Sequence, residues 1–123
     1  MYACKYVGRH MRERRSGKIV NIGSGAGHIA AREGLIYAAA KAGVSHYTRC
    51  LAEELRPFEV NVTCLAPSPT YSGRFLATRS VQEQEGLGRL QRVSRPEDMA
   101  QLMLFLAGPQ SDILTGETIV CWY

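Results

Sequence analysis

Two hydrophobic patterns alternate along this chain, one typical of strands and one typical of helices. Short runs rich in β-branched residues at 18–22 (KIVNI), 60–66 (VNVTCLA) and 117–122 predict buried strands. Apolar residues at helical spacing predict one helix over 37–55 and a second from Pro96 to Gly108. Strands separated by helices are typical of a parallel sheet with helices packed on it. We therefore predict an α/β fold, half of a doubly wound Rossmann-type parallel sheet, with its strands adjacent in chain order.

Each predicted helix has an apolar stripe and a recognisable end. The stripe of the first consists of Ala40, Val44, Tyr47, Leu51 and Leu55. Pro57 lies just beyond it and does not fit a helix interior. The stripe of the second consists of Met99, Leu102, Met103 and Leu106. Pro96 suits its first turn and Gly108 its end, and we expect Met99 and Met103 in the core.

Residues 72–95 show weak periodicity. Gly73, Gly86 and Gly88 interrupt the segment, and glycine lowers the stability of regular structure. The pattern predicts a mobile loop with at most a short helix. Nothing in it is distinctive enough to name a substrate.

Composition places the chain among ordinary single-domain globular proteins. It has 123 residues, 46% of them hydrophobic and 21% charged. No apolar run approaches the roughly 18 residues of a membrane helix, and no apolar signal segment follows the basic start. Cys4, Cys50, Cys64 and Cys121 are scattered without metal-ligand spacing, which favours reduced thiols over disulfides or a metal site. We expect a cytoplasmic protein with no membrane partner, with mitochondrial and peroxisomal locations left open.

The net charge of +4 is concentrated near the start of the chain. The cluster consists of Arg9, Arg12, Arg14, Arg15 and Lys18. It allows attraction of phosphate or nucleic acid, or it is the solvated end of a helix whose dipole favours cations there. No aromatic side chain interleaves the arginines as in a base-stacking surface. We favour the helix end and expect no nucleic-acid partner.

Tyr37 and Lys41 form the motif Y-A-A-A-K and lie on one face of the predicted helix. An ammonium beside a phenol favours the phenolate, and such a phenol acts as general acid toward a carbonyl or general base toward an alcohol. Ser24 directly follows the first strand, where parallel sheets place their ligand sites. Alone, Ser24 would be better explained as a turn serine. Together the three residues indicate chemistry at a carbonyl or alcohol.

These residues and their surroundings resemble the short-chain dehydrogenase/reductase family, in which a catalytic Ser ends a strand and Y-x-x-x-K opens a helix. Ser24 lies thirteen residues before Tyr37, as in many members. Five segments are similar to the family's in its order: GKIVNIGSGAG, YAAAKAGVSHYTRCLAEEL, VNVTCLAPSPT, RPEDMAQLMLFLA and LTGETIV. The likeness runs over 17–120 and extends to 3-oxoacyl-acyl-carrier-protein reductase-like members. It implies that 1–123 is a single partial domain, the C-terminal catalytic half.

The resemblance assigns roles to individual residues. Ser24 would orient a small carbonyl or alcohol substrate, and Tyr37 would be the acid/base. Lys41 would ease the ionisation of Tyr37 and hold the cofactor ribose. The implied reaction is hydride transfer between this substrate and NAD or NADP, with the choice of cofactor open.

Three further residues would contact the cofactor. Pro67 stands where the family has the proline of a turn beside the nicotinamide. Thr70 would offer backbone groups to the carboxamide, and Ser72 a hydroxyl to the carboxamide or a phosphate. The alternative for these three is a rigid turn that leaves a strand.

The sequence also departs from the family. It contains neither the T-G-x-x-x-G-x-G turn that binds pyrophosphate nor the N-A-G motif, and the family's helix Asn would precede Met1. Ser68 replaces the glycine after Pro67, Glu59 stands where glycine is common, and C-W-Y ends the chain. We expect the catalytic half without the cofactor-binding half. Two hypotheses follow: an NAD(P)-dependent oxidoreductase, or a catalytically inactive truncated member that forms a homo-oligomer or associates with full-length subunits.

Overall fold

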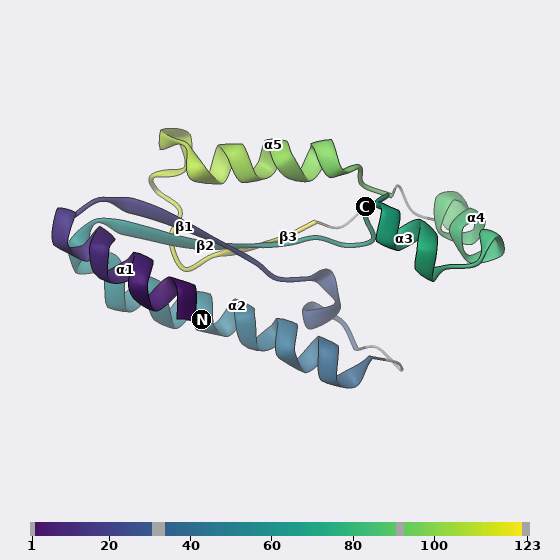
Figure 1. Ribbon diagram of the computed structural model, residues 1–123, viewed down its shortest axis with the longest axis horizontal. Coiled ribbons are helices and arrows are strands. Elements are labelled where there is room, and N and C mark those ends of the chain that lie inside the picture. Colours follow the sequence, from purple (N-terminus) through teal and green to yellow (C-terminus); the bar gives the residue numbers. More distant parts are fainter. Residues whose placement is uncertain (1, 31–33, 91–92, 122–123) are drawn as a thin grey trace.

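The computed structural model describes residues 2–30, 34–90 and 93–121 (Figure 1). Its centre is a parallel sheet of three strands in the order β1-β2-β3. The strands are β1 (Gly17–Ile22), β2 (Val60–Ala66) and β3 (Thr118–Val120). Gly17 is aligned with Val60 at one end of the first pair, and Cys64 is aligned with Thr118 in the second. The parallel pairing in chain order confirms the prediction.

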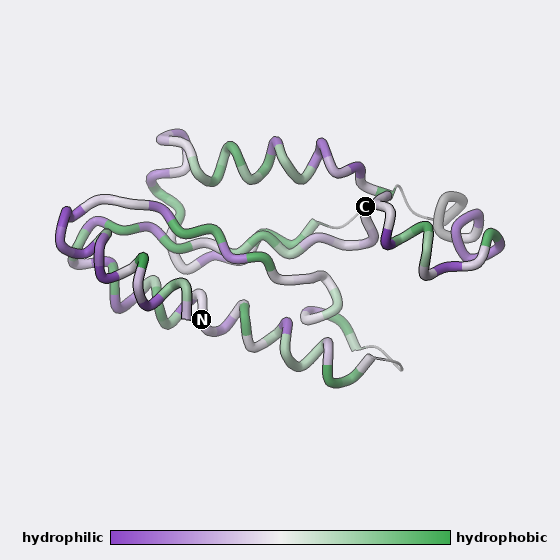
Figure 2. The backbone as a smooth tube through the Cα atoms, viewed as in Figure 1, coloured by the Kyte–Doolittle hydropathy of each residue, from purple (hydrophilic) through white to green (hydrophobic). Residues whose placement is uncertain are grey.

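Helices cover both faces of this sheet. Figure 1 shows α1 (Tyr2–Arg14) and α2 (Leu35–Leu55) on one face and α5 (Pro96–Ala107) on the other. In Figure 2, α1 is largely hydrophilic whereas α5 is mostly hydrophobic beyond its first turn. Short 3-10 turns complete the fold: η1 (Gly25–His28), η2 (Arg56–Phe58) and η3 (Pro109–Ser111). The layers match the predicted half of a doubly wound α/β fold.

The core lies where β2 meets α2. Val60 and Val62 on β2 are at most 1% exposed and form one buried cluster with Leu51 and Leu55 of α2. Because helices cover both faces of the central parallel strand, every residue of β2 except Asn61 is buried. This explains why the apolar residues of the run over 60–66 do not stay on one face but continue through Cys64, Leu65 and Ala66.

Two predicted stripe residues lie outside the core. Ala40 is exposed on α2, whose buried side instead includes Thr48 and Ala52. The prediction that Met103 is a core residue is wrong, because its side chain is 41% exposed. The residue that α5 buries is instead Leu106, which is 2% exposed.

The segment 72–95 is more regular than predicted. It contains α3 (Gly73–Thr78) and α4 (Val81–Leu90), which Figure 1 shows at one end of the molecule. Ser72 caps α3 by accepting a hydrogen bond from the Phe75 backbone at 3.3 Å. Ser80 and Glu83 exchange backbone–side-chain hydrogen bonds of 3.2 and 2.7 Å, a capping box. The pattern S-x-x-E at 80–83 was the signal for α4.

Two elements have slightly different bounds from those predicted. The last strand is β3, shorter than the predicted 117–122, and Trp122 lies outside the described residues. The first predicted helix begins at Leu35 rather than Tyr37, so Tyr37 lies in its first turn.

All of the cysteines named above are free. Among the residues that the structure describes, no helix combines the length and apolar character needed to cross a bilayer.

Most of the basic cluster is engaged within the chain. The Arg12 guanidinium lies 4.2 Å from the centroid of the Phe58 ring, and Arg14 Nε donates to the Ser16 carbonyl at 2.7 Å. Arg15 Nη2 donates to the Pro57 carbonyl at 3.0 Å. These contacts at the end of α1 agree with the expected helix terminus.

Candidate active site

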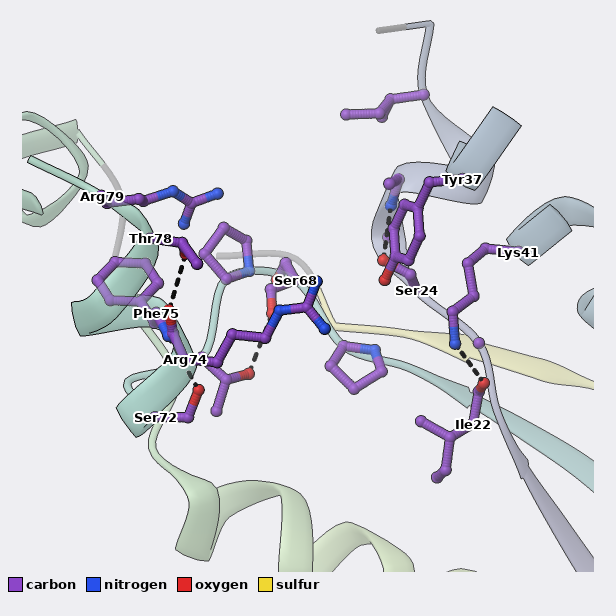
Figure 3. A pocket seen from close by; sticks show the side chains of 17 residues that line it. Ile22, Ser24, Tyr37, Lys41, Ser68, Ser72, Arg74, Phe75, Thr78 and Arg79 are labelled. Carbon is purple, nitrogen blue, oxygen red and sulfur yellow. Dashed lines mark hydrogen bonds between the residues drawn. The ribbon is translucent and has the colours of Figure 1, made fainter. Parts of the chain in front are cut away.

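Polar side chains from three segments meet beyond the carboxyl ends of β1 and β2. A cleft of about 600 Å³ lies there, in the position where parallel α/β sheets bind their ligands. All predicted site residues line this cleft (Figure 3): Ser24, Tyr37, Lys41, Pro67, Thr70 and Ser72. The structure thus brings together residues that lie up to 48 positions apart in the sequence. Their individual roles remain predictions.

The loop that carries Ser24 extends the ladder of hydrogen bonds between β1 and β2. The Gly23 N–H donates to the Leu65 carbonyl at 2.7 Å, and the Gly25 N–H donates to the Pro67 carbonyl at 2.7 Å. These two bonds join the Ser24 loop to the turn at Pro67. The two walls of the cleft are therefore fixed relative to each other through main-chain contacts.

The same loop lies tightly against α2. Ser24 Oγ accepts a hydrogen bond from the Ala26 N–H at 3.3 Å and caps η1. A Cβ atom at Gly27 would lie 2.6 Å from the backbone nitrogen of Ala42, so only glycine permits this approach. Because Lys41 directly precedes Ala42, the close packing brings the Ser24 loop to the helix that carries the Tyr–Lys motif.

Tyr37 and Lys41 face the cleft from the first turns of α2. The Tyr37 side chain is 52% exposed, and in Figure 3 its ring points toward the loop that carries Ser24. Lys41 Nζ lies 5.8 Å from the centroid of the Tyr37 ring. It also donates to the Ile22 carbonyl at 3.0 Å, which holds the ammonium at the end of β1. A phenol and an ammonium are thus placed side by side at the mouth of the cleft.

The opposite wall is formed by the turn after β2 and by α3. Thr70 Oγ1 donates to the Ser68 carbonyl at 3.0 Å, and the Ser68 hydroxyl donates to the Cys121 carbonyl. Ser68, which replaces the family's glycine, thereby ties the turn to the residue that follows β3. Ser72 Oγ caps α3, but its hydroxyl hydrogen stays available to a ligand.

Two cleft residues are not among those predicted from the sequence. Arg74 and Arg79 of α3 and its C-terminal flank line the same cleft. Their sequence context carried one usable signal: Ser72 before Gly-Arg-Phe is an N-cap pattern that predicts a short helix here. The direction in which that helix points its arginines depends on tertiary packing.

The cleft offers hydroxyl, backbone and cationic groups rather than metal ligands. Within residues 2–30, 34–90 and 93–121, no cluster of three His, Cys, Asp or Glu side chains is placed to hold a metal ion. Lys41, Thr70 and Ser72 are groups that bind ribose hydroxyls, amides and phosphates through hydrogen bonds. This set can hold a polar cofactor at one end of the sheet.

Comparison with known proteins identifies the family. A family model described as enoyl-(acyl carrier protein) reductase matches residues 1–121. A cyclohexanol dehydrogenase from Rhodococcus sp. (strain TK6) is 41% identical over 124 residues, which cover 97% of this chain and 46% of the relative. A 3-oxoacyl-(acyl-carrier protein) reductase from Brucella melitensis with bound NAD superposes with a TM-score of 0.85 at 27% identity, covering 96% of this chain and 44% of its own.

A short-chain type dehydrogenase/reductase from Mycobacterium ulcerans superposes with a TM-score of 0.90 at 27% identity, over 98% of this chain and 45% of its own. The chain thus spans about half the length of the relatives it matches. Its strand order and its helix layers agree with these likenesses. The chain belongs to the short-chain dehydrogenase/reductase family.

Proposed function

We propose that this chain is the catalytic half of an NAD(P)-dependent oxidoreductase that interconverts a carbonyl compound and an alcohol. The observation that carries the proposal is the convergence of Ser24, Tyr37 and Lys41 on one cleft at the carboxyl ends of the strands. Membership of the family supports it independently. The relatives named above are a cyclohexanol dehydrogenase, a 3-oxoacyl-(acyl-carrier protein) reductase with bound NAD and a short-chain type dehydrogenase/reductase.

In the direction of reduction, each of the three residues has a defined task. The Ser24 hydroxyl donates a hydrogen bond to the carbonyl oxygen and orients the substrate. The Tyr37 hydroxyl gives its proton to the same oxygen, which becomes the alcohol oxygen. The Lys41 ammonium, 5.8 Å from the Tyr37 ring, stabilises the phenolate that remains. Oxidation of the alcohol runs through the same groups in reverse.

The donor groups of the cleft fit the nicotinamide end of a dinucleotide. Lys41 and Tyr37 would bind the ribose hydroxyls, while Thr70 and Ser72 would bind the carboxamide or a phosphate. A bound nicotinamide supplies a hydride acceptor or donor for the substrate carbon. The pyrophosphate needs backbone N–H groups at a glycine-rich turn, and residues 1–123 contain no such motif. We therefore expect weak cofactor binding by residues 1–123 alone.

The test uses a joined protein, defined as residues 1–123 fused behind the cofactor-binding half of the Rhodococcus cyclohexanol dehydrogenase. Oxidation of cyclohexanol and reduction of small ketones are followed through NAD(P)H absorbance. We expect Tyr37→Phe to lower kcat by roughly 10²-fold or more, because Phe keeps the ring and removes the transferable proton.

Tyr6→Phe is the matched control, since Tyr6 is 66% exposed on α1 and does not line the cleft. It should retain the parent kcat. Turnover by Tyr37→Phe equal to that of the joined protein, or no turnover by the joined protein at all, would refute the proposal.

A second candidate function is association with full-length family subunits by a catalytically inactive chain. It is favoured by exposed apolar side chains: Tyr2, Tyr6, Val7, Leu35 and Ile36 are all more than 40% exposed. In the described part of the chain, β1 pairs only with β2, so its other edge presents unpaired N–H and C=O groups. Both features promote association with another chain.

Light scattering of purified residues 1–123, combined with cofactor titration, tests the second candidate. Association without saturable NADH or NADPH binding supports the second candidate. A monodisperse monomer that binds NAD(P)H with micromolar affinity would refute it and would also contradict the expected weak binding.

A further inference from the structure

The charged side chains in the cleft are of one sign, positive. Its lining includes three cationic side chains, Lys41, Arg74 and Arg79, whereas no Asp or Glu lines it among the described residues. Elsewhere in the described chain, cations such as Lys18 and Arg56 are paired with carboxylates at 2.7 and 2.6 Å. The cleft therefore carries a local positive potential that favours an anionic ligand.

Arg74 extends into this cleft from the first turn of α3. Figure 3 shows its guanidinium pointing away from α3, toward the side of the cleft where Lys41 lies. The helix that carries it is anchored by the Ser72 cap and by Phe75, which is only 6% exposed. Within the residues described, Arg74 forms no ion pair. Its charge is therefore available to a ligand.

Arg79 lies on the same wall. Its guanidinium is 4.8 Å from the centroid of the Phe75 ring, and that ring lies 5.0 Å from the ring of Tyr71. This stacking orients Arg79 at the edge of the cleft. Its charge acts on Glu83, whose pKa is lowered mainly by hydrogen bonds from Ser80 and in part by the charge of Arg79. Arg79 is thus partly compensated, and Arg74 carries more of the free positive charge.

We propose that Arg74, assisted by Arg79, binds the carboxylate of an oxo-acid substrate whose carbonyl group lies beside Tyr37. The inference rests on the proposed function, and it adds the substrate class. The two walls face each other, so a molecule with its carbonyl oxygen at Tyr37 extends toward Arg74 (Figure 3). Apolar side chains of Ile22, Ile29 and Pro67 line the same cleft and suit the methylene groups between the two ends.

Two kinds of anionic group have the chemistry to bind the arginines: the carboxylate of a substrate and a phosphate of the cofactor. Two matched ligand pairs separate them, each differing by one charged group. The pair 5-oxohexanoate and methyl 5-oxohexanoate reports on a substrate carboxylate. The pair nicotinamide mononucleotide and nicotinamide riboside reports on a phosphate. Ligand-observed saturation-transfer NMR on residues 1–123 measures each Kd, and it works for associated chains as well as monomers.

We expect 5-oxohexanoate to bind roughly fivefold more tightly than its methyl ester, the size of one favourable exposed ion pair. Arg74→Gln should reduce this ratio to about one, Arg74→Lys should restore part of it, and added salt should diminish it. Arg49→Gln is the matched control, because Arg49 is exposed on α2 and does not line the cleft. It should leave the ratio unchanged.

Equal binding of the acid and the ester by the unsubstituted chain would overturn the proposal. A ratio that Arg74→Gln leaves intact would also overturn it. If Arg74→Gln abolishes only the preference for the mononucleotide, the arginines bind cofactor phosphate and the assignment to a substrate is wrong. None of these measurements requires turnover. A failure of the oxidoreductase proposal, seen with Tyr37→Phe in the joined protein, is therefore distinguishable from a failure here.

Discussion

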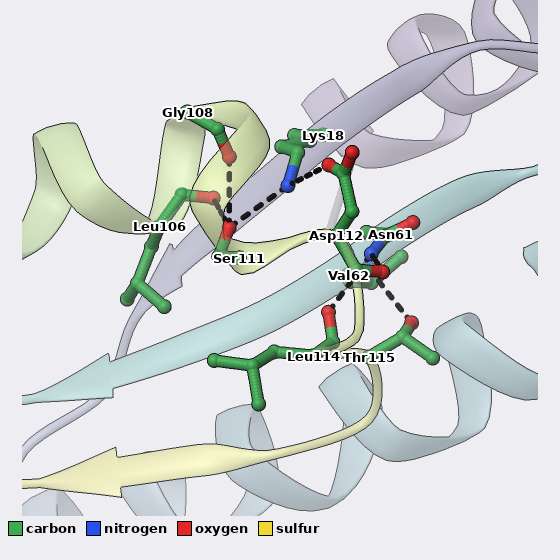
Figure 4. A network of polar contacts seen from close by, with 9 residues as sticks. All are labelled: Lys18, Asn61, Val62, Leu106, Gly108, Ser111, Asp112, Leu114 and Thr115. Carbon is green, nitrogen blue, oxygen red and sulfur yellow. Dashed lines mark hydrogen bonds and ion pairs between the residues drawn. The ribbon is translucent and has the colours of Figure 1, made fainter.

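At the amino ends of the strands, polar side chains bind one another, whereas at the carboxyl ends they face a cleft (Figure 3 and Figure 4). The amino-end network is centred on Lys18 of β1. Its ammonium lies 2.8 Å from Ser111 Oγ and 2.7 Å from the Asp112 carboxylate. Ser111 Oγ in turn donates to the carbonyls of Leu106 and Gly108 at 2.9 and 3.0 Å. This network attaches the end of α5 to the first strand.

The central strand contributes to the same network. Asn61 Nδ2 donates to the carbonyls of Asp112 and Leu114 at 2.6 and 3.0 Å. The Val62 N–H donates to Thr115 Oγ1 at 3.1 Å. Nearly every polar group in this region therefore has a partner inside the protein, and its contribution is to stability.

The carboxyl end is different. Within the described residues, the hydroxyl of Tyr37 and the guanidinium of Arg74 make no hydrogen bond, and the Ser24 hydroxyl accepts only the bond from the Ala26 N–H at 3.3 Å. Groups without internal partners keep their hydrogen-bonding capacity for a ligand. The comparison teaches that substitutions at the two ends should have separable effects, on stability at one end and on binding and catalysis at the other.

The largest effect that tests this separation is expected for Ser24→Ala in the joined protein. Removal of a donor to the reacting oxygen should lower kcat/KM by roughly 10²-fold. Loss of the bond to the Ala26 N–H should cost less than about 1 kcal/mol in the free energy of unfolding. Steady-state kinetics and urea unfolding measure the two quantities. A loss of stability large enough to explain the loss of activity would show that Ser24 acts through the structure of its loop.

Ser111→Ala is the corresponding change at the amino end. Ser111 is 1% exposed. Removal of its hydroxyl takes a donor from the Leu106 carbonyl and one acceptor from Lys18, whereas the Gly108 carbonyl keeps the Ser111 N–H at 3.3 Å. We expect the free energy of unfolding of the joined protein to fall by about 1–3 kcal/mol. At a temperature where the variant is folded, KM should be unchanged.

Ser16→Ala is the control for this prediction. Ser16 is exposed, and its side chain makes no hydrogen bond in the described structure. Its effect on stability should stay within about 0.5 kcal/mol. If Ser111→Ala changed kcat while stability stayed the same, the two ends would not be separable.

The fold could be predicted where hydrophobic patterns are long and regular. Three patterns predicted elements that the structure contains. They are the β-branched run over 60–66, the helical spacing of apolar residues after Tyr37, and the start and end signals at Pro96 and Gly108. The exposure of Met103 could not be predicted. Helical spacing identifies the apolar stripe of a helix, but it does not show which residues of the stripe become buried against the sheet. The helices of segment 72–95 depend on caps at Ser72 and Ser80 rather than on apolar periodicity.

The site could be predicted where it depends on position along strands and helices. Ser24 follows β1, and Tyr37 and Lys41 lie one turn apart on α2, so the sequence already implied that they meet at one end of the sheet. Arg74 and Arg79 could not be predicted as cleft residues. Their direction depends on how α3 packs through Phe75, which is a tertiary contact.

Glu59→Gly tests the amino end of the strands at a different kind of position. The polar side chains there have hydrogen-bond partners, whereas the backbone of Glu59 is strained. Glu59 precedes β2 with φ 59° and ψ 32°, the left-handed region in which glycine is favoured. Its ion pair with Arg15, at 3.5 Å, is exposed and contributes little. We expect Glu59→Gly to raise the free energy of unfolding by about 0.5–1 kcal/mol in urea.

Glu59→Gln separates backbone strain from charge in that experiment. It removes the carboxylate but keeps the side chain that disfavours this φ. The glutamine variant should therefore unfold at the same urea concentration as the parent. A gain in both variants would mean that charge, not backbone strain, limits stability at this position.

The smallest effect is expected at the carboxyl end, in the cap of α4. Hydrogen bonds from the backbone and then the hydroxyl of Ser80 lower the pKa of Glu83 below its ordinary value of 4.5. Because the folded-state pKa is the lower one, the cap stabilises α4 above pH 4.5 and loses this contribution as the pH falls through the folded value. Amide hydrogen-exchange protection of α4, corrected for intrinsic rates, should therefore decrease on acidification from pH 6 to about pH 3. Glu83→Gln should show the weaker protection already at pH 6 and little further change with pH. Protection in the parent that stays constant over this range would show that α4 does not depend on the Ser80–Glu83 cap.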